Sequence, residues 1–171
     1  MVGGGRAVEN ASLTDDTIRV VEALDRLARR QEVQEEFHRA QADGLAQLQR
    51  NPDLASAAVS LTSLIDKLPV GVSSARVFVS RASGSNVIER HSDCTQYLYP
   101  LDGSVETHVM TTAGWRIDRY GGEDIPALES RWHVVPAGVW HRTVAPGMQY
   151  WAIVAFHSAR QVNDELRDLE N

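Results

Sequence analysis

The sequence predicts a mainly β protein, a jelly-roll barrel preceded by an N-terminal α-helical extension. Up to Pro69 the apolar residues recur at helical spacing, whereas after it β-branched and aromatic residues come in short runs divided by Gly, Pro, Asp and Ser. Eight short runs of this kind suit a double-sheet jelly roll, in which few strand edges stay exposed. The chain has 171 residues, of which 43% are hydrophobic, so it is long enough for one compact domain with an appendage.

The first part of the chain divides into a Gly-rich start and a helical extension. Residues 1–13 are polar and rich in Gly, which is typical of a disordered terminus. Residues 14–69 carry an apolar stripe at helical spacing, which begins with the capping residue Thr14 and acidic residues in the first turn. The stripe predicts one long helix or two end to end. The pair Asn51 and Pro52 then ends it and begins a further helix, which runs to the end of the segment.

The barrel is predicted over residues 70–158, and a short terminal helix over 159–171. In the terminal segment Val162, Leu166 and Leu169 would lie on one side of a helix. The strands of the barrel are runs of β-branched and aromatic residues bounded by turn residues. The eight predicted strands are 75–81, 86–91, 95–100, 104–111, 115–119, 131–135, 141–145 and 149–157.

Composition excludes several classes of function. The net charge is -6, and the single Lys and scattered Arg residues provide no basic face for nucleic acid. No run of eighteen apolar residues is present, and the N-terminus lacks an apolar segment, so we expect neither a membrane span nor a secretory signal. The lone Cys94 cannot form an internal disulfide, which agrees with a reducing compartment. These observations together favour the cytoplasm.

Two stretches of the β region resemble the two sequence motifs of the cupin superfamily. In that family a His-x-His pair, a Glu and one later His converge on a metal inside a small β-barrel. The first stretch is E-R-H-S-D-C-T-Q-Y-L-Y-P-L-D-G, in which four residues separate His91 from Gln96 and six separate Gln96 from Gly103. The spacing fits the family motif. Two ligand positions differ, because Glu89 stands where the first His would be and Gln96 where the Glu would be.

The second stretch is P-A-G-V-W-H, and it keeps the centre of the second cupin motif. Pro136, Gly138 and His141 occupy the expected places. Both flanks are lost, since Ser130 stands at the place of a Gly and Ala145 at the place of an Asn. The resemblance therefore implies that His141 is the later metal ligand.

The expected metal ligands are Glu89, His91 and His141. Residues two apart on a strand point to one face, so Glu89 and His91 can present a carboxylate and an imidazole to a single ion. If His141 joins them, the set suits Fe(II), Mn, Ni or Zn and leaves positions for substrate or oxygen. We expect Fe(II) first among these. Gln96 would be a weak fourth ligand, or would hold a ligand or a water in place.

Several alternatives stay open for the site. In one of them Glu89 is a solvent-facing strand residue and His91 a polar residue on a loop. Another alignment to the motif makes His91 and Asp93 the i, i+2 ligand pair. Gln96 then follows Asp93 one residue too closely for the motif spacing. The spare candidate ligands on other predicted strands are His108, His133 and His157.

Two tyrosines of the first motif are the expected catalytic residues. Tyr97 or Tyr99 would give or take a proton if it faces the metal ligands. In a small barrel, aromatic residues otherwise belong to the core. Four arginines would bind a carboxylate or phosphate of the substrate if they point inward, namely Arg76, Arg90, Arg116 and Arg142.

The resemblance implies a mononuclear metal-dependent enzyme that acts on a small metabolite. The reaction would be that of a dioxygenase, or of a lyase, isomerase or cyclase, because fold does not select among these. The changes at Glu89 and Gln96 keep a second hypothesis open, a metal-free barrel that binds a small molecule or a protein partner. We also expect a homodimer in which residues 14–68 contribute to the interface or fold over their own barrel.

Overall fold

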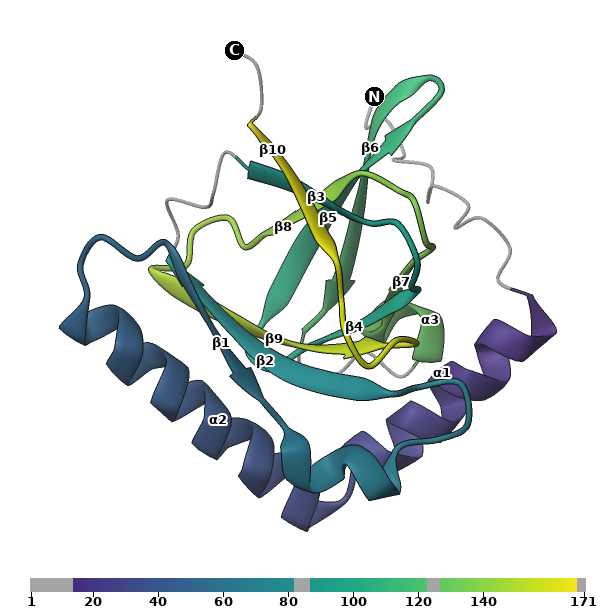
Figure 1. Cartoon of the computed structure of the whole chain (residues 1–171), viewed down its shortest axis with the longest axis horizontal. Helices are drawn as coiled ribbons and strands as arrows, with labels where there is room; N and C mark the ends of the chain where they lie inside the picture. The colour runs from purple at the N-terminus through teal and green to yellow at the C-terminus, as the bar shows by residue number, and fades with distance from the viewer. Residues whose placement is uncertain (1–13, 82–86, 123–126, 169–171) are drawn as a thin grey trace, which may run out of the picture.

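A computed structural model describes residues 14–81, 87–122 and 127–168 of the chain. Two antiparallel five-stranded sheets face each other, and two helices lie under one of them (Figure 1). The predicted mainly β jelly roll with N-terminal helices is therefore confirmed, while the predicted disordered start lies outside the described residues. The first sheet, sheet A, contains in spatial order β1 (Ser56–Ser60), β2 (Ser74–Arg81), β9 (Tyr150–His157), β4 (Gln96–Pro100) and β7 (His133–Val135).

The second sheet, sheet B, carries the predicted metal ligands Glu89, His91 and His141. All eight strands that the sequence predicts are present, distributed over the two sheets. A short helix, α3 (Leu128–Arg131), precedes β7 and shortens the strand predicted from residue 131. The strands of sheet B are, in spatial order, β10 (Asp164–Asp168), β3 (Val87–His91), β8 (His141–Val144), β5 (Ser104–Thr111) and β6 (Gly114–Gly121).

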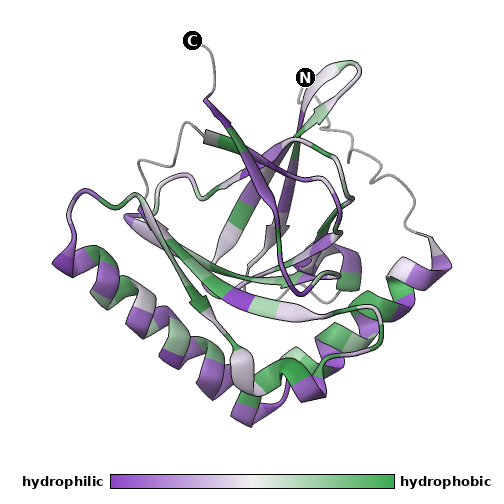
Figure 2. Cartoon of the chain, viewed as in Figure 1, coloured by the Kyte–Doolittle hydropathy of each residue, from purple (hydrophilic) through white to green (hydrophobic). Residues whose placement is uncertain are grey.

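Two helices, α1 (Asp15–Ala28) and α2 (Gln31–Arg50), form where the apolar stripe predicts them. The Thr14 hydroxyl accepts the backbone N–H of Thr17 at 3.3 Å, which satisfies a donor that the first turn leaves free. Both helices turn their hydrophobic faces to sheet A, as Figure 2 shows, and Phe37 is fully buried there. None of the described helices is long and apolar enough to cross a membrane.

The helix predicted after Asn51 is wrong. The structure has β1 and a 3-10 helix, η1 (Thr62–Lys67), in its place. Ser and Thr side chains compete for backbone hydrogen bonds, which weakens the helical preference of this segment. Ala57 on β1 is buried in the core beneath the helices, and the strand pairs along its whole length with β2. The pairing covers a sheet edge that would otherwise be exposed.

The terminal helix predicted over 159–171 is also wrong in the part that the structure describes. Residues 164–168 form β10, which pairs antiparallel with β3 and sets Asp164 opposite His91. The unpaired backbone of β3 offers hydrogen bonds that outweigh the weak helical pattern, and Leu166 stays exposed. The strand therefore brings Asp164 to a predicted metal ligand.

The apolar core lies on both sides of sheet A. One cluster fills the space between sheet A and the helices, and the other lies between the two sheets. Leu98 belongs to the inner cluster, whereas Tyr97 on the same strand belongs to the cluster beneath the helices. Strand side chains alternate between faces, so this assignment decides which residues of β4 enter the barrel.

Candidate metal centre

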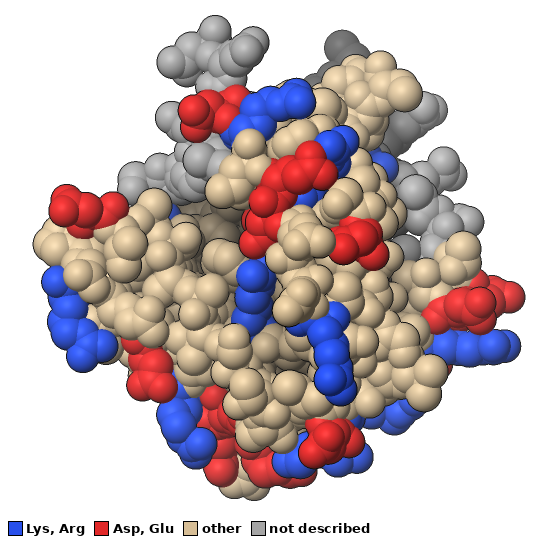
Figure 3. Space-filling model, viewed as in Figure 1, with Lys and Arg blue, Asp and Glu red and all other residues tan. Residues whose placement is uncertain are grey.

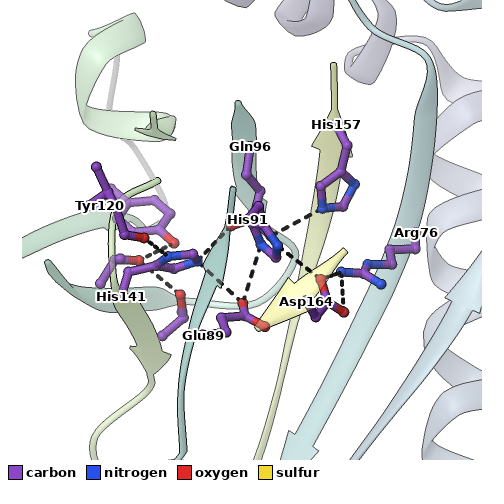
Figure 4. A network of polar contacts seen from close by, with 11 residues as sticks. Arg76, Glu89, His91, Gln96, Tyr120, His141, His157 and Asp164 are labelled. Atoms are coloured by element: carbon purple, nitrogen blue, oxygen red, sulfur yellow. Dashed lines mark hydrogen bonds and ion pairs between the residues drawn. The ribbon is translucent and has the colours of Figure 1, made fainter. Parts of the chain in front are cut away.

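Three of the predicted ligands meet inside the barrel (Figure 4). Glu89 and His91 lie on β3, and Glu89 is directly opposite His141 on β8. The donor atoms of the three side chains all lie within 4.8 Å of one another. Glu89 Oε1 is 3.3 Å from His141 Nε2 and 3.8 Å from His91 Nε2. Both histidines are buried, whereas the Glu89 side chain is 28% exposed, so the cluster has one side open to solvent.

The second motif forms the turn that positions His141. Gly138 has a φ of 78°, a conformation that glycine adopts without steric cost. Its backbone N–H donates to the carbonyl oxygen of His91 at 2.8 Å, which ties the two motifs together. The carbonyl oxygen of Val139 lies 3.0 Å from His141 Nδ1 and accepts its hydrogen. This bond directs the other ring nitrogen, Nε2, into the barrel toward Glu89.

The bonding around His141 fits a cation. Because Nδ1 donates to Val139, a neutral His141 presents a lone pair at Nε2. That lone pair faces two further acceptors, Glu89 Oε1 and Gln96 Oε1, the latter at 3.1 Å. Three acceptors directed to one place repel each other unless a proton or a metal ion lies among them. His91 Nε2, a buried atom without a hydrogen-bond partner, faces the same carboxylate, so the donor set fits a divalent ion.

The ionisation states also fit metal ligands. Burial alone would raise the pKa of Glu89, but the neighbouring imidazoles of His141 and His91 hold this pKa below its usual value. Burial lowers the pKa of His91, although the Glu89 carboxylate partly opposes that effect. At neutral pH the site therefore holds an ionised carboxylate and a neutral imidazole, the states in which these groups bind metals.

Gln96 lies beside the three ligands and is held by His157. Its Nε2 is 3.2 Å from His157 Nε2, while its Oε1 faces His141. Burial, assisted by the charge of Arg76, lowers the pKa of His157 to about 2, so this ring is neutral and accepts the amide hydrogen. The bond therefore turns the carboxamide oxygen of Gln96 toward the ligands. This orientation is the one that a weak fourth ligand needs.

The spare histidines lie in three different places. His157 is buried beside Gln96, and its ring centroid lies 5.6 Å from that of His91. His133 is buried elsewhere in the barrel, where its Nε2 is 3.9 Å from Asp118. The side chain of His108 points out of the barrel. Among the described residues, none of the three joins the cluster of donor atoms around Glu89.

The expectation for Tyr97 and Tyr99 is corrected, because neither side chain reaches this centre. Both alternate with Gln96 along β4 and face the helices. Tyr97 is buried in the outer cluster, and the ring of Tyr99 lies 5.0 Å from that of Trp132. The strand period already contained this information, since a residue next to an inward-facing side chain points outward.

Two residues are missed by the sequence reasoning, the buried Tyr120 and Asp164 on the edge strand β10. Tyr120 is 2% exposed, its hydroxyl lies 3.0 Å from Thr107 Oγ1, and burial raises its pKa, so the phenol stays protonated. Asp164 Oδ1 lies 2.9 Å from His91 Nδ1, an ion-pair distance without hydrogen-bond geometry. Strand parity would find Tyr120 once the inner face of β6 is known. No local signal marks Asp164, because its place depends on the pairing of β10.

No protein-family model and no curated protein matches the sequence. Solved structures with a similar fold do exist. One is Peruvianin-I, a cysteine peptidase from Thevetia peruviana latex, with a TM-score of 0.51 and 13% identity over 69% of this chain and 70% of that chain. Another is a mutant of the oxalate decarboxylase of Bacillus subtilis, with a TM-score of 0.51 and 11% identity over 66% of this chain.

At such identities the likeness shows the fold alone. It supports the predicted cupin-like jelly roll as a fold, so the chain is a two-sheet β-barrel with a helical extension. The matched region makes up only 28% of the oxalate decarboxylase chain. Any activity of this protein therefore has to be argued from its own site.

Proposed function

We propose that this protein is a mononuclear metal-dependent cupin enzyme that acts on a small metabolite. The observation that carries the proposal is the cluster of Glu89 with the buried His91 and His141, whose donor atoms converge within 4.8 Å. Two imidazoles and one carboxylate with open positions form the set used by non-haem Fe(II) oxygenases. We therefore propose Fe(II) as the ion and a dioxygenase as the class. Zn, Mn or Ni with a lyase, isomerase or cyclase reaction is the nearest variant.

The residues of the chain would hold the ion and shape the space beside it. A bound ion supplies Lewis acidity or redox chemistry to a substrate at its open positions. Glu89 contributes the negative charge, and the carbonyl oxygen of Val139 fixes the imidazole of His141. Gln96, oriented by His157, offers its carboxamide oxygen from the opposite sheet. The apolar cluster between the sheets keeps bulk water away from the inner side of the site.

A metal-free barrel that binds a small molecule is the second candidate function. The neutral amide of Gln96 favours it, because an amide binds a metal ion less strongly than the carboxylate of the family motif. A peptidase with a cysteine nucleophile is not supported. Cys94 is 1% exposed, and burial together with the charges of Asp93 and Asp164 raises its pKa, which is the reverse of what a reactive thiolate needs.

Metal analysis of the purified protein tests the proposal. We expect a single ion per chain in the wild type, purified without added metal or loaded anaerobically with Fe(II). The His141→Ala variant should lose this ion and keep its circular dichroism spectrum, since it removes a ligand and little apolar packing. The matched control is His108→Ala, which changes a histidine that points out of the barrel. Equal metal content in His141→Ala and wild type would contradict the proposal.

A further inference from the structure

A second group of polar side chains lies beside the candidate metal centre, and we call it the Arg76 seat. It consists of Arg76 on β2, His157 on β9, His91 on β3 and Asp164 on β10 (Figure 4). Arg76 and His157 belong to sheet A and extend toward the two residues of sheet B. The seat therefore shares His91 with the metal centre and lies directly next to it.

The donors of the seat are poorly satisfied. The Arg76 side chain is 20% exposed, and its Nε is a buried atom without a hydrogen-bond partner. Its Nη2 reaches the two carboxylate oxygens of Asp164 only at 3.5 Å each. His157 Nδ1 is likewise buried without a partner, and it carries the ring hydrogen because Nε2 accepts from Gln96. Buried N–H groups almost always have acceptors. The free N–H groups of Arg76 and His157 therefore indicate an acceptor that fits the Arg76 seat better than Asp164 does.

Asp164 fills the seat loosely. Its contact to His91 lacks hydrogen-bond geometry, and its contacts to Arg76 are at the upper limit for a hydrogen bond. The residue lies on the largely exposed edge strand β10, which pairs only with β3 among the described strands. Figure 3 shows charged side chains of both signs crowded along β10 on this face. The Asp164 side chain is 30% exposed, so this side of the seat faces solvent.

We propose that Arg76 and His157 bind a carboxylate group of the substrate, and that Asp164 occupies its place when no substrate is present. The inference rests on the proposed function, because it sets the substrate beside the metal ion. A guanidinium fork matches the two coplanar oxygens of a carboxylate. The group that now lies in the seat, Asp164, is itself a carboxylate, which favours the same chemistry in the ligand. The substrate class is therefore a small carboxylic acid whose other end reaches the metal.

Binding of malonate to the metal-free protein, measured by isothermal titration calorimetry, tests the seat without involving the metal. The Asp164→Asn variant should bind malonate about tenfold more tightly, because it removes the competing carboxylate. Arg76→Gln should weaken binding about tenfold or more, and Arg76→Lys should retain part of it, since a lysine keeps the charge but not the fork. The matched control is Glu165→Gln, which removes the contact of β10 to Arg90 and should leave the affinity within about twofold.

Two results would overturn the inference. One is equal malonate affinity in Arg76→Gln and wild type, with both proteins folded by circular dichroism. The other is inorganic phosphate binding as tightly as malonate with the same dependence on Arg76. Failure here is distinguishable from failure of the proposed function. If the protein binds metal but no malonate, only the proposal for the Arg76 seat fails. If it binds malonate through Arg76 but takes up no metal, the seat stands and the proposed metal enzyme fails.

Discussion

At position 96 a neutral amide stands where the cupin motif has a carboxylate, and we expect this difference to weaken metal binding at the candidate centre. We expect Gln96→Glu to bind Fe(II) or Zn(II) about tenfold more tightly or better, because it adds a charged oxygen ligand at the place where Gln96 Oε1 now faces His141. Competition with a chromophoric chelator measures the affinity. Gln96→Leu, which removes the oxygen, should weaken metal binding.

The effect of Gln96→Glu on the thermal midpoint should change sign when metal is removed. Without an ion, a second carboxylate beside Glu89 is repelled, so the metal-free Gln96→Glu protein should melt below the wild type. With metal bound, the Gln96→Glu protein should melt at a higher temperature than the wild type, since tighter binding to the folded state adds stability. A thermal midpoint that is insensitive to metal in both proteins would show that Gln96 does not face an ion.

Among the elements, α1 is held to the barrel by a buried carboxylate. Asp25 accepts hydrogen bonds from Trp132 Nε1 at 2.9 Å, Arg131 Nη2 at 3.0 Å and Arg29 Nε at 2.8 Å. Burial raises the pKa of Asp25, but the three hydrogen bonds outweigh it and lower the pKa below the usual value. A depressed folded-state pKa means that the stabilisation is complete above the unfolded value near 3.9 and is lost as pH falls through the folded value.

We therefore expect Asp25→Asn to lower the free energy of unfolding by about 2 kcal/mol at pH 7, the size expected for charge-assisted hydrogen bonds. The difference from wild type should shrink as the pH falls below 4. Urea unfolding at several pH values measures both effects. Asp16→Asn is the matched control, because Asp16 pairs with Arg19 at 3.5 Å on the exposed side of α1 and should matter little. A pH-independent difference would show that the charge of Asp25 is not what binds the helix.

The close approach of α2 to sheet A is tested at Gly44. A Cβ at this position would lie 2.7 Å from Val79 Cγ2, which is closer than real Cβ contacts. Alanine gains about 1 kcal/mol of helix propensity over glycine, but overpacking costs about 1–3 kcal/mol. We expect Gly44→Ala to destabilise by about 1 kcal/mol in urea unfolding. Ala42→Gly, on the exposed side of α2, measures propensity alone, and a stabilised Gly44→Ala protein would contradict the packing.

Elements with a strong internal pattern could be predicted from the sequence, whereas elements defined by a partner could not. The eight strands and the helices α1 and α2 carry their own periodicity and their own end signals. The two strands that were missed, β1 and β10, are edge strands whose conformation is set by pairing with β2 and β3. Motif spacing was enough to predict the residues of the candidate centre, Glu89, His91, Gln96 and His141. Asp164 follows only from the pairing of β10.

At the scale of the whole molecule, the helices act as a cover for sheet A. Removing residues 1–50 would keep both sheets, including β1, but would uncover apolar residues such as Tyr97, Val154 and Phe156. We expect the truncated protein to bind a hydrophobic dye, to melt at a lower temperature and to aggregate. A truncated chain that stays soluble with an unchanged thermal midpoint would show that the helices are an independent module.

The homodimer stays a prediction. The helices α1 and α2 already bury their apolar faces on their own barrel, so a second subunit would contact another surface. Met110, Trp115 and Ile117 are exposed on the outer face of the β5–β6 hairpin. Sedimentation velocity at micromolar concentration measures the subunit count, and we expect a dimer. A single monomeric species across the concentration range would contradict this expectation.

The most direct test of the metal centre is a crystal structure of the Fe(II)-loaded protein with anomalous data on both sides of the iron edge. The predicted result is one anomalous peak inside the barrel, about 2.0–2.2 Å from Nε2 of His91, Nε2 of His141 and a carboxylate oxygen of Glu89. A barrel without a peak, or an iron bound by other side chains, would contradict the account.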